Sequence, residues 1–201
     1  MIEVEKKFIL SAAQKKQLLQ GADFLGEKNF TDEYFDNEKF SLSTGDIWLR
    51  ARNGEFELKL PMHQTEKKLI DQYQEIEGEK TIREIFAIPK LKSFREDIAQ
   101  FGYQVFCTCS TKRMKYKKNG FAIDLDEVFY DDFGYTLCEI ELMVEKKEEV
   151  AQAALQIEKF AKEQGLEIVP VRGKIVEFLK RKKPQHYQAL WEAGILKGDE
   201  E

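Results

Sequence analysis

Pairs of like-charged side chains at positions i and i+2 recur along this sequence. Residues two apart on a β-strand share one face of the sheet and lie about 7 Å apart. Like charges placed in this way repel one another, so each acidic pair favours a bound cation and each basic pair favours a bound anion. The charged positions of this kind are Glu3, Glu5 and Lys7; Arg50 and Arg52; Glu55, Glu57 and Lys59; Glu75 and Glu77; Arg113, Lys115 and Lys117; Asp124 and Asp126; and Glu139 and Glu141.

A single site satisfies pairs of both signs if the strands curl with their charged faces inward. Carboxylates suit a hard divalent cation, whereas guanidinium and ammonium groups suit phosphate oxygens. A polyphosphate carrying Mg²⁺ or Mn²⁺ fits between them, and phosphoryl transfer depends on positioning and charge neutralisation more than on a nucleophilic side chain. For any one strand, a half-buried sheet with its charges in water is the alternative interpretation. The inward acidic wall is Glu3, Glu5, Asp124, Glu139 and Glu141, and the basic wall is Arg50, Arg52, Lys59 and Arg113.

Alternation of apolar and charged residues predicts eight strands. Asn53-Gly54 and Asn119-Gly120 stand between strands, where two-residue hairpin turns favour Asn-Gly, so these strands should pair antiparallel. We therefore predict a mainly antiparallel β (α+β) fold, a closed eight-stranded barrel with helices packed outside. The predicted strands cover residues 2–10, 30–36, 46–52, 55–60, 71–77, 103–117, 121–128 and 137–144.

Capping residues and apolar spacing predict the helices. Ser11 caps the first helix, and Thr81 with Glu84 forms a capping box that starts the second. Gly165 ends the longest helix, and Pro184 separates the last two. The predicted helices cover residues 11–20, a segment from Thr81, and residues 93–101, 148–164, 173–182 and 185–193.

Composition sets the limits of function. The chain has 201 residues, 42% of them hydrophobic, and no repeat or linker, so we expect one domain over residues 1–201 with a polar tail from about residue 197. A net charge of -5 argues against nucleic acid or an anionic membrane as a partner. The charged N-terminus and the absence of a long apolar run predict a soluble, cytoplasmic protein with three reduced cysteines. We expect His63, His186, Lys115 and Lys117 at the surface.

Ordered sequence blocks resemble a known family. Glu3-Val4-Glu5-Lys6-Lys7 matches an E-x-E-x-K signature near the N-terminus. With the blocks that follow, the chain resembles the CYTH, or triphosphate tunnel, superfamily, and within it the thiamine-triphosphatases. The other blocks are residues 32–36, 46–52, 56–59, 111–113, 123–126, 133–135 and 139–141, with a matching C-terminal segment at 173–187.

The resemblance implies a metal-dependent hydrolase, active as a monomer, that converts thiamine triphosphate into thiamine diphosphate and phosphate, with Mg²⁺ (or Mn²⁺) as cofactor. It places Trp48 at the mouth of the barrel, facing the thiazolium ring, and implies that Lys59 and Tyr34 activate or place the attacking water. By the same resemblance, the metal is held by Glu3, Glu5, Asp124, Glu139 and Glu141, and the triphosphate by Lys7, Arg50, Arg52, Lys59, Arg113 and Lys174.

Three other functions fit the same residues. An inorganic triphosphatase would use the same charged interior without an aromatic contact to thiamine, and relative kcat/KM values for thiamine triphosphate, tripolyphosphate and ATP separate the two. An adenylate cyclase would release pyrophosphate and form cyclic AMP. A non-catalytic polyphosphate binder would bind without releasing phosphate.

Overall fold

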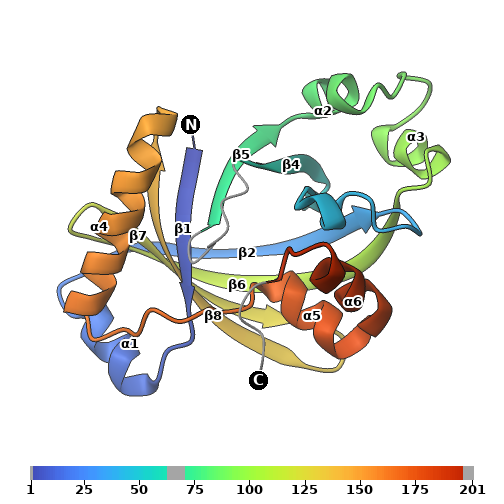
Figure 1. Ribbon diagram of the computed structural model, residues 1–201. Helices are drawn as coiled ribbons and strands as arrows, with labels where there is room; N and C mark the ends of the chain where they lie inside the picture. Colours follow the sequence, from blue (N-terminus) through green and yellow to red (C-terminus); the bar gives the residue numbers. More distant parts are fainter. Residues whose placement is uncertain (1, 63–70, 197–201) are drawn as a thin grey trace.

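Eight antiparallel strands close into one barrel in the computed structural model, which describes residues 2–62 and 71–196 (Figure 1). Around the barrel the strand order is β1-β5-β4-β3-β2-β6-β7-β8. The predicted closed eight-stranded barrel is therefore confirmed, while His63 and the polar tail from about residue 197 lie outside the described residues. The strands are β1 (Ile2–Phe8), β2 (Asp23–Asp36), β3 (Trp48–Arg52), β4 (Glu55–Pro61), β5 (Asp71–Glu77), β6 (Gln104–Lys118), β7 (Phe121–Phe129) and β8 (Gly134–Val144).

Both predicted Asn-Gly hairpins are present. Asn53 and Gly54 have φ angles of 50° and 91°, and Asn119 and Gly120 have φ angles of 52° and 89°. A two-residue type I′ turn requires positive φ at both central positions, which asparagine and glycine tolerate best. The turns fix the register of the flanking strands, so that Arg52 pairs with Glu55 across one of them.

The two faces of the barrel wall differ as the alternation predicted. Val4, Ile123 and Ile140 point outward and are fully buried beneath Ile157 of the longest helix. On another side of the barrel, Leu58 is buried with residues of two short helices. The outer apolar face thus packs under helices and leaves the charged face to the interior. The helices are α1 (Ala12–Leu19), α2 (Glu79–Phe86), α3 (Phe94–Gln100), α4 (Val150–Glu163), α5 (Lys174–Lys182) and α6 (Pro184–Glu192).

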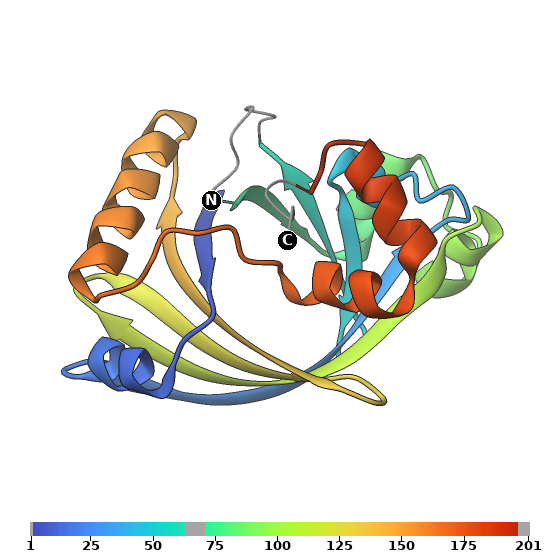
Figure 2. The same cartoon turned by 60° about the horizontal axis from the view of Figure 1, so that its bottom comes forward.

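Helices α5 and α6 have a different role from the others. They pack on Tyr34, Cys107 and Val128, which lie towards one end of strands β2, β6 and β7. A segment without regular structure, residues 166–173, connects α4 to α5 and passes across the opening of the barrel in front of β1 (Figure 2). We call this segment the strap. Among the described residues, no helix has the length and apolar character needed to cross a membrane.

Several element boundaries differ from the predictions, and two of the differences have a clear local cause. Strand β2 starts at Asp23, seven residues before the predicted start, because residues 23–29 pair with the long strand β6 although they lack an alternating apolar pattern. The prediction that Thr81 and Glu84 form a capping box at the start of the second helix is wrong. Helix α2 begins at Glu79, after Gly78, which has a φ angle of 89°. The glycine lets the chain turn sharply out of β5, so the helix starts two residues earlier.

His186 corrects another expectation, because it is buried rather than at the surface. Its Nε2 atom lies 2.6 Å from Ser43 Oγ, and its ring stacks on Phe40 with 4.0 Å between ring centroids. The carboxylate of Asp36 accepts the backbone N–H groups of Leu42 and Ser43 beside it. His186 therefore attaches α6 to the loop that precedes β3. No local pattern around an isolated histidine in a polar helix indicates such a contact.

Burial gives His186 a testable pH dependence. Desolvation lowers the pKa of His186 from 6.5 to about 4. Between these two values the unfolded chain binds the proton more readily than the folded one, so folding stability falls as the pH decreases from about 6.5 to about 4. We expect His186 to account for roughly 2 kcal/mol of this loss. Urea unfolding of wild type and His186→Gln across this range checks it, since the variant should show a shallower slope; equal slopes would contradict the assignment.

Candidate active site

The interior of the barrel is a cavity of about 540 Å³ lined by charged side chains from strands β1 to β6 and β8, and by Arg172 and Lys174 at the end of the strap. Twelve of the thirteen predicted site residues line it: Glu3, Glu5, Lys7, Tyr34, Trp48, Arg50, Arg52, Lys59, Arg113, Glu139, Glu141 and Lys174. The thirteenth, Asp124, is fully buried directly behind the lining, where it bonds to Arg113 and Lys115. The structure therefore brings the predicted acidic and basic residues together inside the barrel.

Three carboxylates form a compact cluster that we call the carboxylate trio: Glu3, Glu5 and Glu141. One oxygen of each lies within 4.8 Å of the others, and Glu5 and Glu141 are direct partners in the β1–β8 ladder. Burial, with the neighbouring acids, raises the pKa of Glu5 to about 7 and that of Glu141 to about 9. A set of three crowded oxygen donors fits a hard divalent cation, which would relieve this repulsion.

Asp124 and Glu139, which were also predicted to hold metal, both contact Arg113. Arg113 donates to Asp124 at 2.6 Å and to Glu139 at 2.7 Å, and it makes two further bonds of 2.6 Å to Asp126. Although burial opposes ionisation, Arg113 and Lys7 lower the pKa of Glu139 to about 2. Among the described residues, Asp124 Oδ1 is the one buried side-chain polar atom that has no hydrogen-bond partner. The carboxylate of Asp124 therefore has a coordination position that its contacts with Arg113 and Lys115 do not use.

Three basic residues of the interior, Arg50, Arg52 and Lys174, are held by carboxylates. Arg52 makes a two-point contact with Asp32 at 2.8 and 3.1 Å, and Lys174 Nζ lies 2.6 Å from the same carboxylate. Arg50 donates from Nε to Glu57 at 2.8 Å. These contacts fix the orientation of the guanidinium and ammonium groups within the cavity.

Lys59 and Tyr34, predicted to activate or place the attacking water, both line the cavity. Lys59 donates to Glu3 at 2.6 Å and lies 2.9 Å from Glu75. Burial opposes its charge, but Glu5 and Glu3 outweigh it and raise the pKa of Lys59, so its amine stays protonated at neutral pH. Burial raises the pKa of Tyr34, so its phenol stays neutral. Both groups can therefore donate hydrogen bonds to a phosphate or a water.

Trp48 lies beside two residues that sequence reasoning missed. Its indole Nε1 donates to Asp46 at 3.1 Å, and the hydroxyl of Tyr73 donates to the same oxygen at 2.8 Å. Asp46 has a φ angle of 59°, in the left-handed region, and ends the turn at Ser43–Gly45. This carboxylate holds the two aromatic side chains in place along the cavity.

Phe30 and Lys115 complete the interior, and neither was predicted there. The Phe30 ring lies 3.9 Å from the Arg52 guanidinium carbon and 5.2 Å from Lys174 Nζ, within cation–π distance of both. Lys115 was expected in solvent but lines the cavity and donates to Asp124 at 2.9 Å. Its position near the Asn119-Gly120 turn favours solvent, but Lys115 shares the inward parity of Arg113 on β6, and that parity decides where its side chain lies.

A closed antiparallel barrel with acidic and basic side chains facing each other across its interior defines the triphosphate-tunnel class of proteins. The chain belongs to the CYTH family: the CYTH domain model matches residues 1–169. It is 29% identical to human thiamine-triphosphatase over 216 residues, which cover 96% of this chain and 90% of the human protein. It is 30% identical to the thiamine-triphosphatase of Macaca fascicularis over 222 residues, which cover 98% of this chain and 92% of the macaque protein.

Solved structures agree with this fold. The PH1819 protein of Pyrococcus horikoshii superimposes with a TM-score of 0.66 at 25% identity, covering 90% of this chain and 99% of that one. A Hippeastrum protein described as having a dominant triphosphatase activity superimposes with a TM-score of 0.54 at 19% identity, covering 90% and 96%.

Proposed function

We propose that this chain is a metal-dependent hydrolase that cleaves the terminal phosphate of thiamine triphosphate, giving thiamine diphosphate and phosphate. The observation that carries the proposal is the interior itself, where the carboxylate trio and the six basic residues predicted to hold the triphosphate line one cavity. Two thiamine-triphosphatases related to this chain over nearly its full length support the substrate. All of these residues come from one chain, which is consistent with a monomeric enzyme.

The carboxylate trio would hold the divalent ion, and Mg²⁺ is the ion that we propose. A metal bound there would neutralise charge on the phosphate oxygens as the bond to the leaving group breaks. Asp124 and Glu139 are direct partners in the β7–β8 ladder, and both bond to Arg113. Glu139 is two residues from Glu141 of the trio on β8. In this arrangement they orient Arg113 and complete the negative side of the site.

The basic side chains would bind the triphosphate and place its terminal phosphorus for attack by water. Arg50, Arg52 and Lys174 offer donors around Asp32 and Glu57. A loose phosphoryl-transfer transition state gains most from such fixed positive charge and needs little help from a strong base. Lys59 and Tyr34, both protonated at neutral pH, fit a role in placing water or phosphate by donating hydrogen bonds, rather than by removing a proton.

Two ion pairs inside the barrel suggest how the metal and the triphosphate assist one another. Lys7 bonds to Glu5, and Lys59 bonds to Glu3, so two proposed metal ligands occupy two proposed phosphate ligands. A metal that binds Glu3 and Glu5 would weaken both ion pairs and so favour contact of the two lysines with phosphate, while Lys59 keeps Glu75 at 2.9 Å. Binding of the metal and of the triphosphate should therefore be mutually reinforcing, as thermodynamic linkage requires of any such coupling.

Phosphate release tests the proposed function directly. The purified chain is assayed with thiamine triphosphate, tripolyphosphate and ATP, with Mg²⁺ and with excess EDTA. We expect the highest kcat/KM with thiamine triphosphate and no turnover in EDTA. Preference for tripolyphosphate would favour the inorganic triphosphatase, for which the charged residues suffice because they contact only the phosphate chain. Formation of cyclic AMP, or binding without phosphate release, would overturn the proposal.

Trp48 offers a sharper test of the organic substrate. Its indole, held by Asp46, provides an aromatic face for the cationic thiazolium ring, a contact worth about 1–2 kcal/mol when desolvated. We expect Trp48→Ala to lower kcat/KM for thiamine triphosphate by about tenfold. Its kcat/KM for tripolyphosphate should stay within about twofold of the wild-type value. Trp191→Ala, on the outer surface of α6, is the matched control. Equal losses with both substrates would show that Trp48 supports the barrel and not the thiamine group.

A further inference from the structure

The strap carries one substrate-binding residue into the barrel from outside the eight strands. It begins at Leu166, which is buried against the outer core, crosses the opening and ends at Gly173, the residue before Lys174. Lys174 Nζ then reaches Asp32 at 2.6 Å inside the cavity. The position of this ammonium group therefore depends on how the end of the strap is held.

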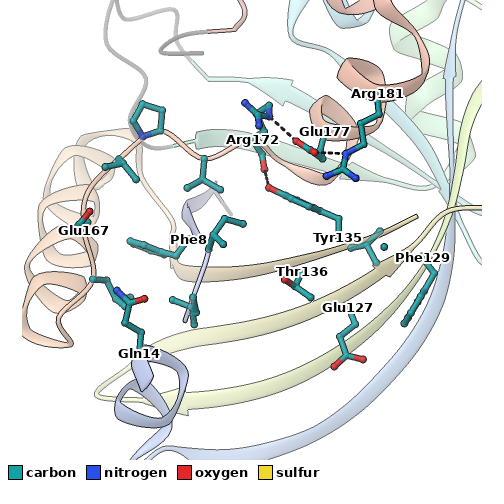
Figure 3. Close-up of a pocket in the computed structure, with 18 residues that line it drawn as sticks. Phe8, Gln14, Glu127, Phe129, Tyr135, Thr136, Glu167, Arg172, Glu177 and Arg181 are labelled. Atoms are coloured by element: carbon teal, nitrogen blue, oxygen red, sulfur yellow. Dashed lines mark hydrogen bonds and ion pairs between the residues drawn. The ribbon is translucent and has the colours of Figure 1, made fainter. Parts of the chain in front are cut away.

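Packing alone does not hold the strap. Between it and the outer face of the barrel lies a second cavity of about 910 Å³, and residues from Leu166 to Arg172 form one side of it (Figure 3). The Val169 side chain is 46% exposed, and Pro170 is also exposed. A segment with so little packing on either side can shift unless specific bonds restrain it.

Two tyrosines at the β7–β8 connection supply such bonds. The hydroxyl of Tyr135 donates to the carbonyl oxygen of Arg172 at 2.7 Å, and that of Tyr130 donates to the carbonyl oxygen of Lys174 at 2.6 Å. The two carbonyls lie on either side of Gly173. The backbone that leads into Lys174 is thus fixed from the barrel wall at two points.

Further contacts restrict the same point. Glu177 of α5 accepts from Arg172 at 2.7 Å and from Arg181 at 2.6 Å, which joins the strap to the first turns of the helix (Figure 3). A methyl group placed on Gly173 would lie 3.3 Å from Lys7 Cε, so the strap passes close to a second proposed phosphate ligand. The end of the strap therefore has little freedom, although its middle has few contacts.

We infer that Tyr130 and Tyr135 are positioning residues that set the location of the Lys174 ammonium group in the cavity, and so its contact with the triphosphate. This inference rests on the proposed function and adds to it two residues that do not touch the substrate. The tyrosines act through the backbone carbonyls of Arg172 and Lys174, so their hydroxyls, and not their rings, are the groups that matter.

A double-mutant cycle separates positioning from a general effect on stability. The variants are Tyr130→Phe, Tyr135→Phe and Lys174→Ala, alone and combined. Tyr103→Phe, in the segment between α3 and β6 where the ring stacks on Phe86, is the control tyrosine. Lys174→Ala should keep its fold because Asp32 retains its two-point contact with Arg52. The readouts are kcat/KM for thiamine triphosphate and the Kd of tripolyphosphate by calorimetry.

We expect each tyrosine variant to lose about tenfold in kcat/KM and in affinity, and Lys174→Ala to lose about a hundredfold. Adding Tyr130→Phe or Tyr135→Phe to Lys174→Ala should lower kcat/KM and affinity no further, because the lysine that the tyrosines position is gone. The inference is wrong if the tyrosine changes lower kcat/KM and affinity tenfold both in the wild type and in Lys174→Ala. It is also wrong if the tyrosine variants keep the wild-type kcat/KM and Kd. If the wild-type chain releases no phosphate, the proposed function fails, but the cycle on the Kd of tripolyphosphate still tests the positioning role.

Discussion

Glu5→Gln should abolish Mg²⁺-dependent phosphate release, with a loss of about a hundredfold or more. Glu5 is 4% exposed and stands in the carboxylate trio between Glu3 and Glu141. Glutamine keeps the shape of the side chain and removes its charge. The trio then offers a divalent ion one carboxylate fewer, and a neutral amide oxygen is a weaker ligand for a hard cation.

Metal binding can be measured without turnover. A ligand that binds only the folded chain stabilises it by about 2.7 kcal/mol at a concentration a hundred times its Kd. Mg²⁺ should therefore raise the Tm of the wild-type chain in thermal unfolding, and the increase should be lost in Glu5→Gln. Glu127→Gln, on the outer face of β7 beside Asp126, serves as the control and should keep both activity and the increase in Tm. If Glu5→Gln keeps its activity and its Mg²⁺-dependent increase in Tm, the trio is not the metal site.

The sequence allowed the barrel and most of its interior to be predicted because both follow from a local pattern. Alternating side chains face opposite sides of a strand, so the parity of Glu3, Arg50 and Glu139 was readable from spacing alone. The two Asn-Gly turns then joined neighbouring strands with known geometry. Burial of Val4 and Ile140 under α4 supports the same assignment from the opposite face.

What the sequence did not reveal depends on contacts between distant segments. Arg113 bonds to three carboxylates on β7 and β8, and this choice is set by strand register rather than by neighbours along the chain. His186 is buried because α6 meets a loop some 140 residues earlier, as its contact with Ser43 shows. Lys174 was found only through family resemblance, since it starts a helix and follows no strand parity. Asp46 was overlooked because its role is to hold two aromatic residues that are themselves far apart in the sequence.

Arg52→Ala should lower kcat/KM by about a hundredfold to a thousandfold, the usual cost of removing one donor that faces developing charge. Arg52 lies on the inward face of β3, and Asp32 and Phe30 fix the direction of its guanidinium group. Arg52→Lys should recover only part of the activity. Lysine restores the charge but not the planar two-point geometry that suits phosphate oxygens.

The fold should survive this change because the carboxylate of Asp32 keeps a partner. Asp32 is fully buried, and an isolated charge there would be strongly destabilising. Lys174 Nζ remains 2.6 Å away and continues to balance it, so Arg52→Ala should unfold at a urea concentration close to that of the wild type. Arg95→Ala, which removes a surface contact with Glu33 on the outer face of β2, is the control arginine and should retain full activity. If Arg52→Ala keeps its fold and turns over thiamine triphosphate at the wild-type rate, the basic side of the cavity does not bind the transferred phosphate. The reaction would then have to be located elsewhere on the molecule.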